Sequence, residues 1–252
     1  MIAHDRLREI ARLVEARGSV PTAQLAKRFG VSAAQLRRDL DSLEKQRILV
    51  RRHGAAVHPT FLFGETSHES RTERALEAKR QVAMAAVALV PDGASVWVDA
   101  GTTCEVAARF LFARPSVRVI THSVPVLQAA LSARAQVICP GGELRPISGA
   151  LVGSEALRAL EELRADWAFL GATAVSAEGA FTTELTESRM KARILASARH
   201  GVLLADATKW EATAPVRFAE LHGFSRWVSD DAWDPAARRA AKKAFPNLQF
   251  TK

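Results

Sequence analysis

The sequence lacks the features that mark membrane-spanning, disulfide-stapled or zinc-binding proteins. Its 252 residues contain no tyrosine and only two cysteines, and Cys104 and Cys139 show no CxxC or Cys/His ligand spacing. A structural zinc site is therefore not expected, and a disulfide stays open on parity alone. The longest apolar run, residues 82–91, is too short to cross a bilayer, and the first ten residues contain no signal-peptide core. We expect a cytoplasmic protein without a metal or cofactor.

What is present is an ordinary globular composition with an uneven charge. The apolar fraction is 48%, the charged fraction 25% and the formal net charge +8. Residues 1–57 hold twelve Lys/Arg and six Asp/Glu, whereas the remaining 195 residues hold 23 and 21. This distribution is typical of a chain in which one module contacts nucleic acid and the other does not.

Two short helices are predicted at the N-terminus. The first carries apolar residues at helical spacing and ends at Gly18; these residues are Leu7, Ile10 and Val14. Thr22 is placed to cap the second helix, which Gly30 ends.

A third helix is strongly specified from Ser32 onward. Ser32 is a good N-cap, and Gln35 stands where a capping box needs it. Val31 can pack on Leu36 as a hydrophobic staple. Two basic side chains fall off the apolar stripe of this helix and point outward: Arg37 and Arg38. Two helices, a glycine turn and such a third helix describe a helix-turn-helix.

The next segment predicts a wing. Residues 48–50 form a strand-type run, Arg51-Arg52-His53-Gly54 a basic turn, and residues 55–57 a second strand. We therefore expect a winged helix-turn-helix DNA-binding domain over residues 1–57. The candidates for the major groove are Ser32, Gln35, Arg37 and Arg38. Arg51 and Arg52 are expected to contact phosphates, while His53 fits a phosphate contact or a turn residue equally well.

A plainer interpretation of the basic helix face exists. Arg37 and Arg38 would then be solvated and would pair with Asp41 or Glu44. The caps, the wing and the charge asymmetry together favour DNA binding.

The rest of the chain alternates in the manner of an open, mostly parallel α/β sheet. Residues 58–68 are interpreted as a linker and residues 69–252 as the second domain, which opens on a long helix over 69–89. Strand-type runs follow at 94–98, 117–121, 136–139, 167–170, 202–205 and 227–229. Helical segments lie between them at 104–112, 125–132, 153–162 and 184–199.

Polar and glycine-rich residues follow several of these strands, where ligands bind in open α/β sheets. The four groups are Asp99-Ala100-Gly101-Thr102-Thr103, Thr121-His122-Ser123, Pro140-Gly141-Gly142 and Asp206-Ala207-Thr208-Lys209. Lys191, in the helix over 184–199, is within reach of the same edge. Each group alone is more often a turn or a cap, but their shared placement predicts that they converge on an anion.

Both halves resemble the DeoR family of bacterial regulators. The N-terminal motif is V-S-x-x-x-L-R-R-D-L-x-x-L-E followed by R-x-H-G-A. In the second half the matching positions are Asp99, Gly101, Thr102, Thr103, Thr121, Ser123, Gly141, Gly142, Gly171, Lys191, Asp206 and Lys209. The sequence departs from the family at Gln35, where threonine is usual, at Ala55, where glycine is usual, at His122, where asparagine is often seen, and at Thr208, where serine is common.

The resemblance implies a fold like that of ribose-5-phosphate isomerase and its relatives, and a phosphorylated sugar or sugar-like metabolite as effector. It implies a repressor that acts as a homodimer or homotetramer on operator DNA. Gly101, Thr102 and Thr103 would present N–H groups and hydroxyls to phosphate, and Lys191 or Lys209 would neutralise its charge. Asp99 and Asp206 would bind sugar hydroxyls or order the lysines, and the glycines 141 and 142 would let the backbone approach the ligand.

Two other functions fit the same residues. One is a sugar-phosphate isomerase or related enzyme with a DNA-binding domain attached, in which Asp99 or Glu184 would be the general base. The other is an architectural DNA binder without an effector. Turnover of a sugar phosphate would indicate the first, and no stabilisation by any phosphorylated sugar would indicate the second.

Overall fold

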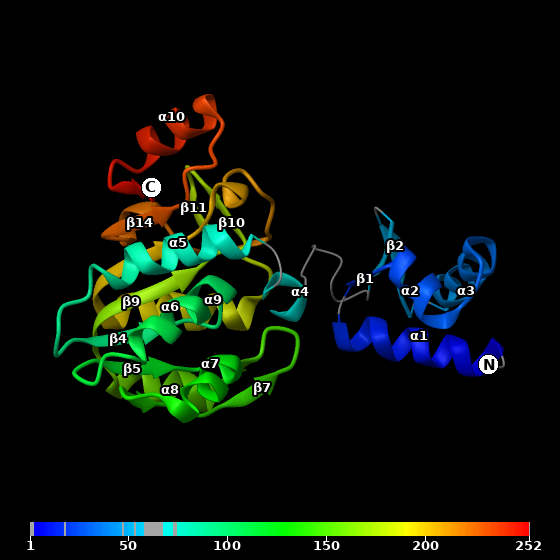
Figure 1. Ribbon diagram of the computed structural model, residues 1–252, viewed down its shortest axis with the longest axis horizontal. Helices are drawn as coiled ribbons and strands as arrows, with labels where there is room; N and C mark the ends of the chain where they lie inside the picture. Colours follow the sequence, from blue (N-terminus) through cyan, green and yellow to red (C-terminus); the bar gives the residue numbers. More distant parts are fainter. Residues whose placement is uncertain are drawn as a thin grey trace. The chain divides into compact units, whose positions relative to one another are not determined.

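The computed structural model describes residues 3–17, 19–46, 48–52, 54–57, 68–72 and 75–251. The chain forms two compact units, residues 1–71 and 72–252 (Figure 1). The predicted order, a winged helix-turn-helix followed by an open parallel α/β sheet, is confirmed.

The N-terminal unit packs helices against a small antiparallel sheet. The helices are α1 (Ala3–Arg17), α2 (Thr22–Phe29) and α3 (Ala33–Lys45). The sheet has the order β1 (Ser19–Pro21), β3 (Ala55–Val57) and β2 (Val50–Arg52). Apolar residues from all three helices fill the core between them, among them Ile10, Val14, Leu25, Leu36 and Leu40. Burial of this periodic stripe is what holds helices this short in place.

Capping agrees with the sequence at α3 and differs at α2. Ser32 caps α3 by accepting a hydrogen bond of 3.2 Å from the backbone N–H of Gln35, and Gly30 ends α2 in the left-handed region at φ 61°. The predicted cap by Thr22 is wrong: Thr22 is the first residue of α2, and its hydroxyl donates to the carbonyl of Gly54 at 2.8 Å. This bond ties α2 to the wing, which local sequence could not show.

The wing differs from the prediction in two ways. Arg51 and Arg52 lie in strand β2 and not in the turn, so the turn is shorter than expected. Strand β1 was not predicted, because three residues ending in proline carry little strand signal. His53 lies outside the described residues, as does most of the expected linker, 58–67.

The second unit is built on a seven-stranded parallel sheet. Its order is β15 (Leu248–Phe250), β14 (Arg226–Ser229), β12 (Ala198–Leu204), β9 (Ala165–Gly171), β4 (Ser95–Val98), β5 (Arg118–Thr121) and β6 (Gln136–Ile138). The chain runs outward from β4 to β6 and then returns to β9 on the other side of β4. The strand order therefore reverses between β4 and β9, and crevices that bind ligands form at such a switch point.

Helices cover both faces of this sheet (Figure 1). One face packs on α5 (Leu76–Val87), α6 (Thr102–Leu111) and α7 (Val124–Ala129). The other packs on α8 (Ser154–Glu162), α9 (Leu185–Ser197) and α10 (Pro235–Ala244). Alternate strand residues serve the two cores: Val96 and Val98 face the first, and the fully buried Trp97 faces the second.

The second unit also contains smaller strands outside the main sheet, and several of them were not predicted. A hairpin joins β7 (Glu143–Arg145) to β8 (Ala150–Val152), and a separate sheet has the order β10 (Ala174–Ser176), β11 (Gly179–Thr182), β13 (Val216–Ala219). Helix α10 and strand β15 were also missed. The single helix expected over 69–89 is wrong: α4 (His68–Thr72) and α5 are separate, and Ala75, just before α5, is left-handed at φ 50°. Among the described residues, no helix is both long and apolar enough to span a bilayer.

Candidate functional sites

The outward face of α3 carries the basic residues expected to contact DNA. Arg37 and Arg38 are exposed, opposite the buried Leu36 and Leu40. Ser32 is exposed at the start of the same helix. Ser32, Arg37 and Arg38 are therefore exposed together on α3. In helix-turn-helix proteins the corresponding helix enters the major groove of DNA with its N-terminal residues against the bases.

A chain of side-chain hydrogen bonds fixes Arg38 to the core of the unit. Arg38 Nη2 donates to Gln35 Oε1 at 2.8 Å, and Gln35 Nε2 donates to Asp39 Oδ1 at 3.0 Å. Asp39 Oδ2 accepts from Arg6 Nε of α1 at 2.7 Å. Burial alone would raise the pKa of Asp39, but the bonds from Arg6 and Gln35 outweigh it and hold the pKa below its usual value. Gln35 thus supports Arg38 and does not complete the predicted capping box.

Sequence reasoning missed Arg6 and Asp39. The one available signal was Asp39 itself, a carboxylate next to the buried Leu40 on the apolar side of α3. A charge on an apolar stripe needs a partner, but its partner lies 33 residues away.

Arg51, whose contact with a phosphate stays a prediction, is held by two carboxylates of α3. Its Nη1 lies 2.6 Å from Asp41 Oδ1, and its Nε lies 2.9 Å from Glu44 Oε2. Its backbone N–H also donates to Glu44 Oε1 at 2.9 Å, which is the largest cause of the lowered pKa of Glu44. The side chain of Arg52 lies outside the described part of the chain. These contacts make Arg51 a link between wing and recognition helix.

We therefore expect Arg51→Met to weaken DNA binding without changing its salt dependence. A phosphate contact releases about one counterion, so its removal lowers the slope of log K against log salt by about 1. Arg37, exposed on the same surface, is the matched control, because Arg37→Met should lower that slope. Fluorescence anisotropy titrations at several salt concentrations measure both. If the slope of log K against log salt falls equally in the two variants, Arg51 contacts a phosphate.

In the second unit, predicted residues meet where the strand order reverses. Asp99 follows β4, and its Oδ2 accepts from the backbone N–H of Gly171, the last residue of β9, at 3.0 Å. Lys191 of α9 donates to the same oxygen and to the carbonyl of Gly171 at 3.1 Å. His122, after β5, has its Nε2 3.7 Å from Asp99 Oδ1. We call Asp99, Gly101, His122, Gly171 and Lys191 the switch-point site.

The charges of the switch-point site are buried and compensated. Asp99, His122 and Lys191 are 1%, 2% and 8% exposed. Burial acts to raise the pKa of Asp99, but the charge of Lys191 and the hydrogen bonds from Lys191 and the N–H of Gly171 outweigh it, so the carboxyl stays ionised. Burial also lowers the pKa of His122 and raises that of the Cys104 thiol. The site therefore holds one ion pair beside a neutral imidazole.

Two other predicted residues have structural partners. Thr121 donates its hydroxyl to the carbonyl of Val98 at 2.8 Å and accepts from the N–H of Ser123 at 3.1 Å. Ser123 caps α7 by accepting from the N–H of Val126 at 3.4 Å. Both side chains are fully buried, so they position the loop that carries His122.

Gly141 and Gly142, the two glycines before β7, differ in what the fold requires of them. Gly142 has φ 125°, and a Cβ there would lie 2.7 Å from the carbonyl oxygen of Val152. Glycine at 142 is therefore required for the β7–β8 hairpin to close. At Gly141, with φ 79°, a Cβ would meet nothing within 4 Å. Close approach to a ligand is thus a proposal for Gly141 alone.

Thr102 and Thr103 open α6 beside Gly101, whose backbone caps the helix without a side-chain bond. Asp206 caps a short 3₁₀ turn, where it accepts from the N–H of Thr208 at 3.0 Å and from the Thr208 hydroxyl. Lys209 ends that turn half-buried and forms no ion pair with any residue that the structure describes. Asp206 therefore orders Thr208 and not a lysine.

One ion pair near the site escaped sequence reasoning. Arg145 of β7 lies 2.9 Å from Glu187 of α9, and both side chains are mostly buried. The negative charge of Glu187 also acts to raise the pKa of His122, although burial outweighs it. Glu184, named above as a general base, caps α9 by accepting from the N–H of Glu187 at 2.9 Å.

The buried imidazole gives a test by pH. In the unfolded chain His122 titrates near about 6.5, while burial keeps it neutral in the fold, so acid favours the unfolded state. The free energy of unfolding should fall below about pH 6.5, by up to about 1.4 kcal/mol per pH unit. His122→Asn should remove this part of the fall. Denaturant titrations between about pH 7 and pH 5.5 measure it; the same pH dependence in both proteins would show that folding does not lower the pKa of His122.

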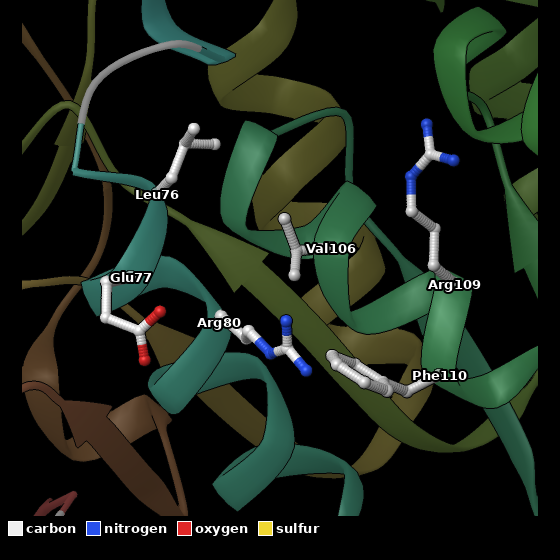
Figure 2. Close-up of a pocket in the computed structure, with 6 residues that line it drawn as sticks. All are labelled: Leu76, Glu77, Arg80, Val106, Arg109 and Phe110. Atoms are coloured by element: carbon white, nitrogen blue, oxygen red, sulfur yellow. The ribbon is translucent and has the colours of Figure 1, made fainter.

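A groove of about 390 Å³ lies elsewhere on this unit. Figure 2 shows the residues that line it, which are Leu76, Glu77 and Arg80 of α5 and Val106, Arg109 and Phe110 of α6, with Arg80 and Phe110 pointing toward each other. None of these residues belongs to the switch-point site or to the predicted ligand positions, so the groove is a separate feature of the helical layer.

Comparison with known proteins decides the family. Residues 6–60 match the DeoR-like helix-turn-helix domain, and residues 74–231 match the DeoR C-terminal sensor domain. The chain belongs to the DeoR family. It is a DNA-binding transcriptional regulator with an N-terminal helix-turn-helix and a C-terminal sensor domain.

Named relatives align over most of their length. The lactose phosphotransferase system repressor of Staphylococcus aureus (strain N315) is 33% identical over 91% of this chain and 93% of the relative. The glycerol-3-phosphate regulon repressor of Escherichia coli (strain K12) is 29% identical over 84% of each. Among solved structures, ribose 5-phosphate isomerase A from Methanocaldococcus jannaschii aligns with a TM-score of 0.40 and 23% identity over 54% of each chain.

Proposed function

We propose that this regulator is a repressor whose operator binding is controlled by a phosphorylated sugar or sugar-like metabolite bound at the carboxyl ends of β4, β5, β9 and β12. The observation that supports the proposal is the switch-point site. Its buried charged and polar side chains lie at the edge of the sheet where open parallel sheets bind ligands. The repressors to which the chain is similar are named for lactose phosphotransferase and glycerol-3-phosphate systems. We infer that this regulator acts in the cytoplasm, on the chromosome.

The phosphate has a natural place at the start of α6. Backbone N–H groups and the hydroxyls of Thr102 and Thr103 lie at this helix N-terminus, where an anion is stabilised. The charge of Lys191 is already paired with Asp99. We therefore assign neutralisation of the phosphate to Lys209 and the helix amides, with Lys191 as the residue that keeps Asp99 ionised and in place.

The enzyme alternative finds less support in the geometry. Asp99 is ion-paired with a lowered pKa, which makes it a weak base, and Glu184 is engaged as a helix cap. We propose that the chain senses its ligand without turning it over. On DNA we propose a homodimer or homotetramer, since operators for such domains contain paired half-sites.

The experiment is binding of the purified chain to the DNA upstream of its own gene, repeated with inorganic phosphate, glycerol 3-phosphate, ribose 5-phosphate, galactose 6-phosphate and glucitol 6-phosphate. Specific binding that one of the organic phosphates releases supports the proposal. Specific binding that none of them changes would indicate a DNA binder without this control, and consumption of one of them would indicate an enzyme.

A further inference from the structure

Three buried polar atoms of the switch-point region have no hydrogen-bond partner among the described residues. They are Trp97 Nε1, Asp99 Oδ1 and His122 Nδ1. Their side chains are 0%, 1% and 2% exposed. Buried polar atoms are nearly always paired, because an unpaired one costs the desolvation free energy of that group. Asp99 Oδ1, a buried carboxylate oxygen without a partner in the part of the chain that the structure describes, therefore indicates a place where a polar group of a ligand is received.

The spacing of Asp99 and His122 shows what fits between them. Asp99 Oδ1 and His122 Nε2 are 3.7 Å apart, which is too far for a direct hydrogen bond. One oxygen atom at about 2.8 Å from each completes two good bonds. The other carboxylate oxygen of Asp99 is already taken by Lys191 and Gly171, so only Oδ1 is free to receive it.

The chemistry of the two groups selects a hydroxyl. An ionised carboxylate only accepts hydrogen bonds, whereas a neutral imidazole donates from one nitrogen. With the proton of His122 on Nε2, the bridging group must donate to Asp99 and accept from His122. A hydroxyl does both, whereas a carbonyl, an ether or a fully ionised phosphate oxygen cannot donate. The Trp97 ring lies beside His122, with its centroid 6.4 Å from that of the imidazole.

We propose that Asp99 Oδ1 and His122 Nε2 bind one hydroxyl group of the effector, which makes His122 a specificity-determining residue for polyhydroxylated phosphates. This inference rests on the proposed function, because it takes the effector to be a phosphorylated sugar or sugar alcohol. It adds that different residues bind the phosphate and recognise the hydroxyl groups. The amides of α6 and Lys209 hold the phosphate, and the buried pair reads the carbon skeleton. Inorganic phosphate meets the first requirement and not the second.

The test compares His122→Leu with His122→Asn in the full chain. Leucine removes the donor, while asparagine keeps a donor and an acceptor. The probes are inorganic phosphate, glycerol 3-phosphate, ribose 5-phosphate, galactose 6-phosphate and glucitol 6-phosphate, and the readout is the ratio of the Kd of phosphate to the Kd of each organic phosphate. We expect at least one ratio well above 1 in the wild type, a fall of about tenfold or more in His122→Leu, and a smaller fall in His122→Asn.

A second measurement needs no variant, in case leucine prevents folding. For the organic phosphate that binds most tightly to the wild type, at least one monodeoxy analogue should bind about tenfold or more weakly. The inference is overturned if every deoxy analogue binds as well as its parent, if phosphate binds as tightly as every organic probe, or if His122→Leu leaves the ratios unchanged. These binding ratios are measured without DNA. Failure of the hydroxyl contact to Asp99 and His122 is therefore distinguished from failure of effector control over operator binding.

Discussion

Lys191→Met is expected to lower the free energy of unfolding of the sensor domain by about 3–5 kcal/mol. Lys191 is the one cation that contacts Asp99 among the described residues, and the Asp99 side chain is 1% exposed. Methionine fills a similar volume and removes the charge, so an ionised carboxylate would be left buried without a counterion. Breaking such a pair costs far more than the pair itself contributes.

The double variant separates charge from packing. Asp99→Asn alone should also destabilise, because it leaves the Lys191 ammonium, whose side chain is 10% exposed, without its partner. Asp99→Asn with Lys191→Met removes both charges and should cost less than the sum of the single changes, with a coupling of about 1–3 kcal/mol. Strict additivity would contradict the assignment of these two residues as a pair.

Tryptophan fluorescence during urea unfolding measures this domain by itself. All five tryptophans lie between residues 97 and 233, outside the N-terminal unit. The control is Arg193→Met, because Arg193 lies on the same helix as Lys191 and its ion pair with Glu161 is long, at 3.9 Å, and exposed. Arg193→Met should change stability by less than about 1 kcal/mol.

Local signals in the sequence were sufficient for most of the architecture. Ser32 caps α3 with a bond that spans three residues, and Gly30 ends α2 through its own backbone. Short apolar runs identified all the strands of the parallel sheet except β15, because in such a sheet strands are buried on both faces. Asp99 and Gly171 could be placed near each other because each follows or ends such a strand.

The features that the sequence did not reveal depend on contacts between distant residues. The partner of Asp39 is 33 residues away and that of Asp99 is 92 residues away, so neither ion pair has a local signature. The capture of Arg51 by Asp41 and Glu44 needs the strand to lie against α3. Ala75, the left-handed residue just before α5, lies in a stretch without glycine or proline, so the local sequence contains no signal for a break there.

Arg38→Ala is expected to weaken operator binding about 10- to 100-fold, the effect of losing a bidentate contact to a base edge worth about 1–3 kcal/mol. The guanidinium is exposed on α3, and one of its nitrogens is anchored to Gln35. That anchor leads through Asp39 to α1, so the side chain is already oriented before any contact with DNA. An ordered arginine loses less conformational entropy on binding than a free one.

The comparison that decides the role of Arg38 uses operator and unrelated duplexes side by side. A base contact makes Arg38→Ala lower the ratio of operator to unrelated affinity, whereas a phosphate contact lowers both affinities alike and leaves the ratio unchanged. Lys45→Ala, which removes a positive charge from the exposed end of the same helix, controls for net charge. Gln35→Ala should lower the ratio less than Arg38→Ala, since it frees the guanidinium without removing it. Operator affinity equal to wild type in Arg38→Ala would exclude the residue from the interface and leave Arg37 as the basic reader on this face.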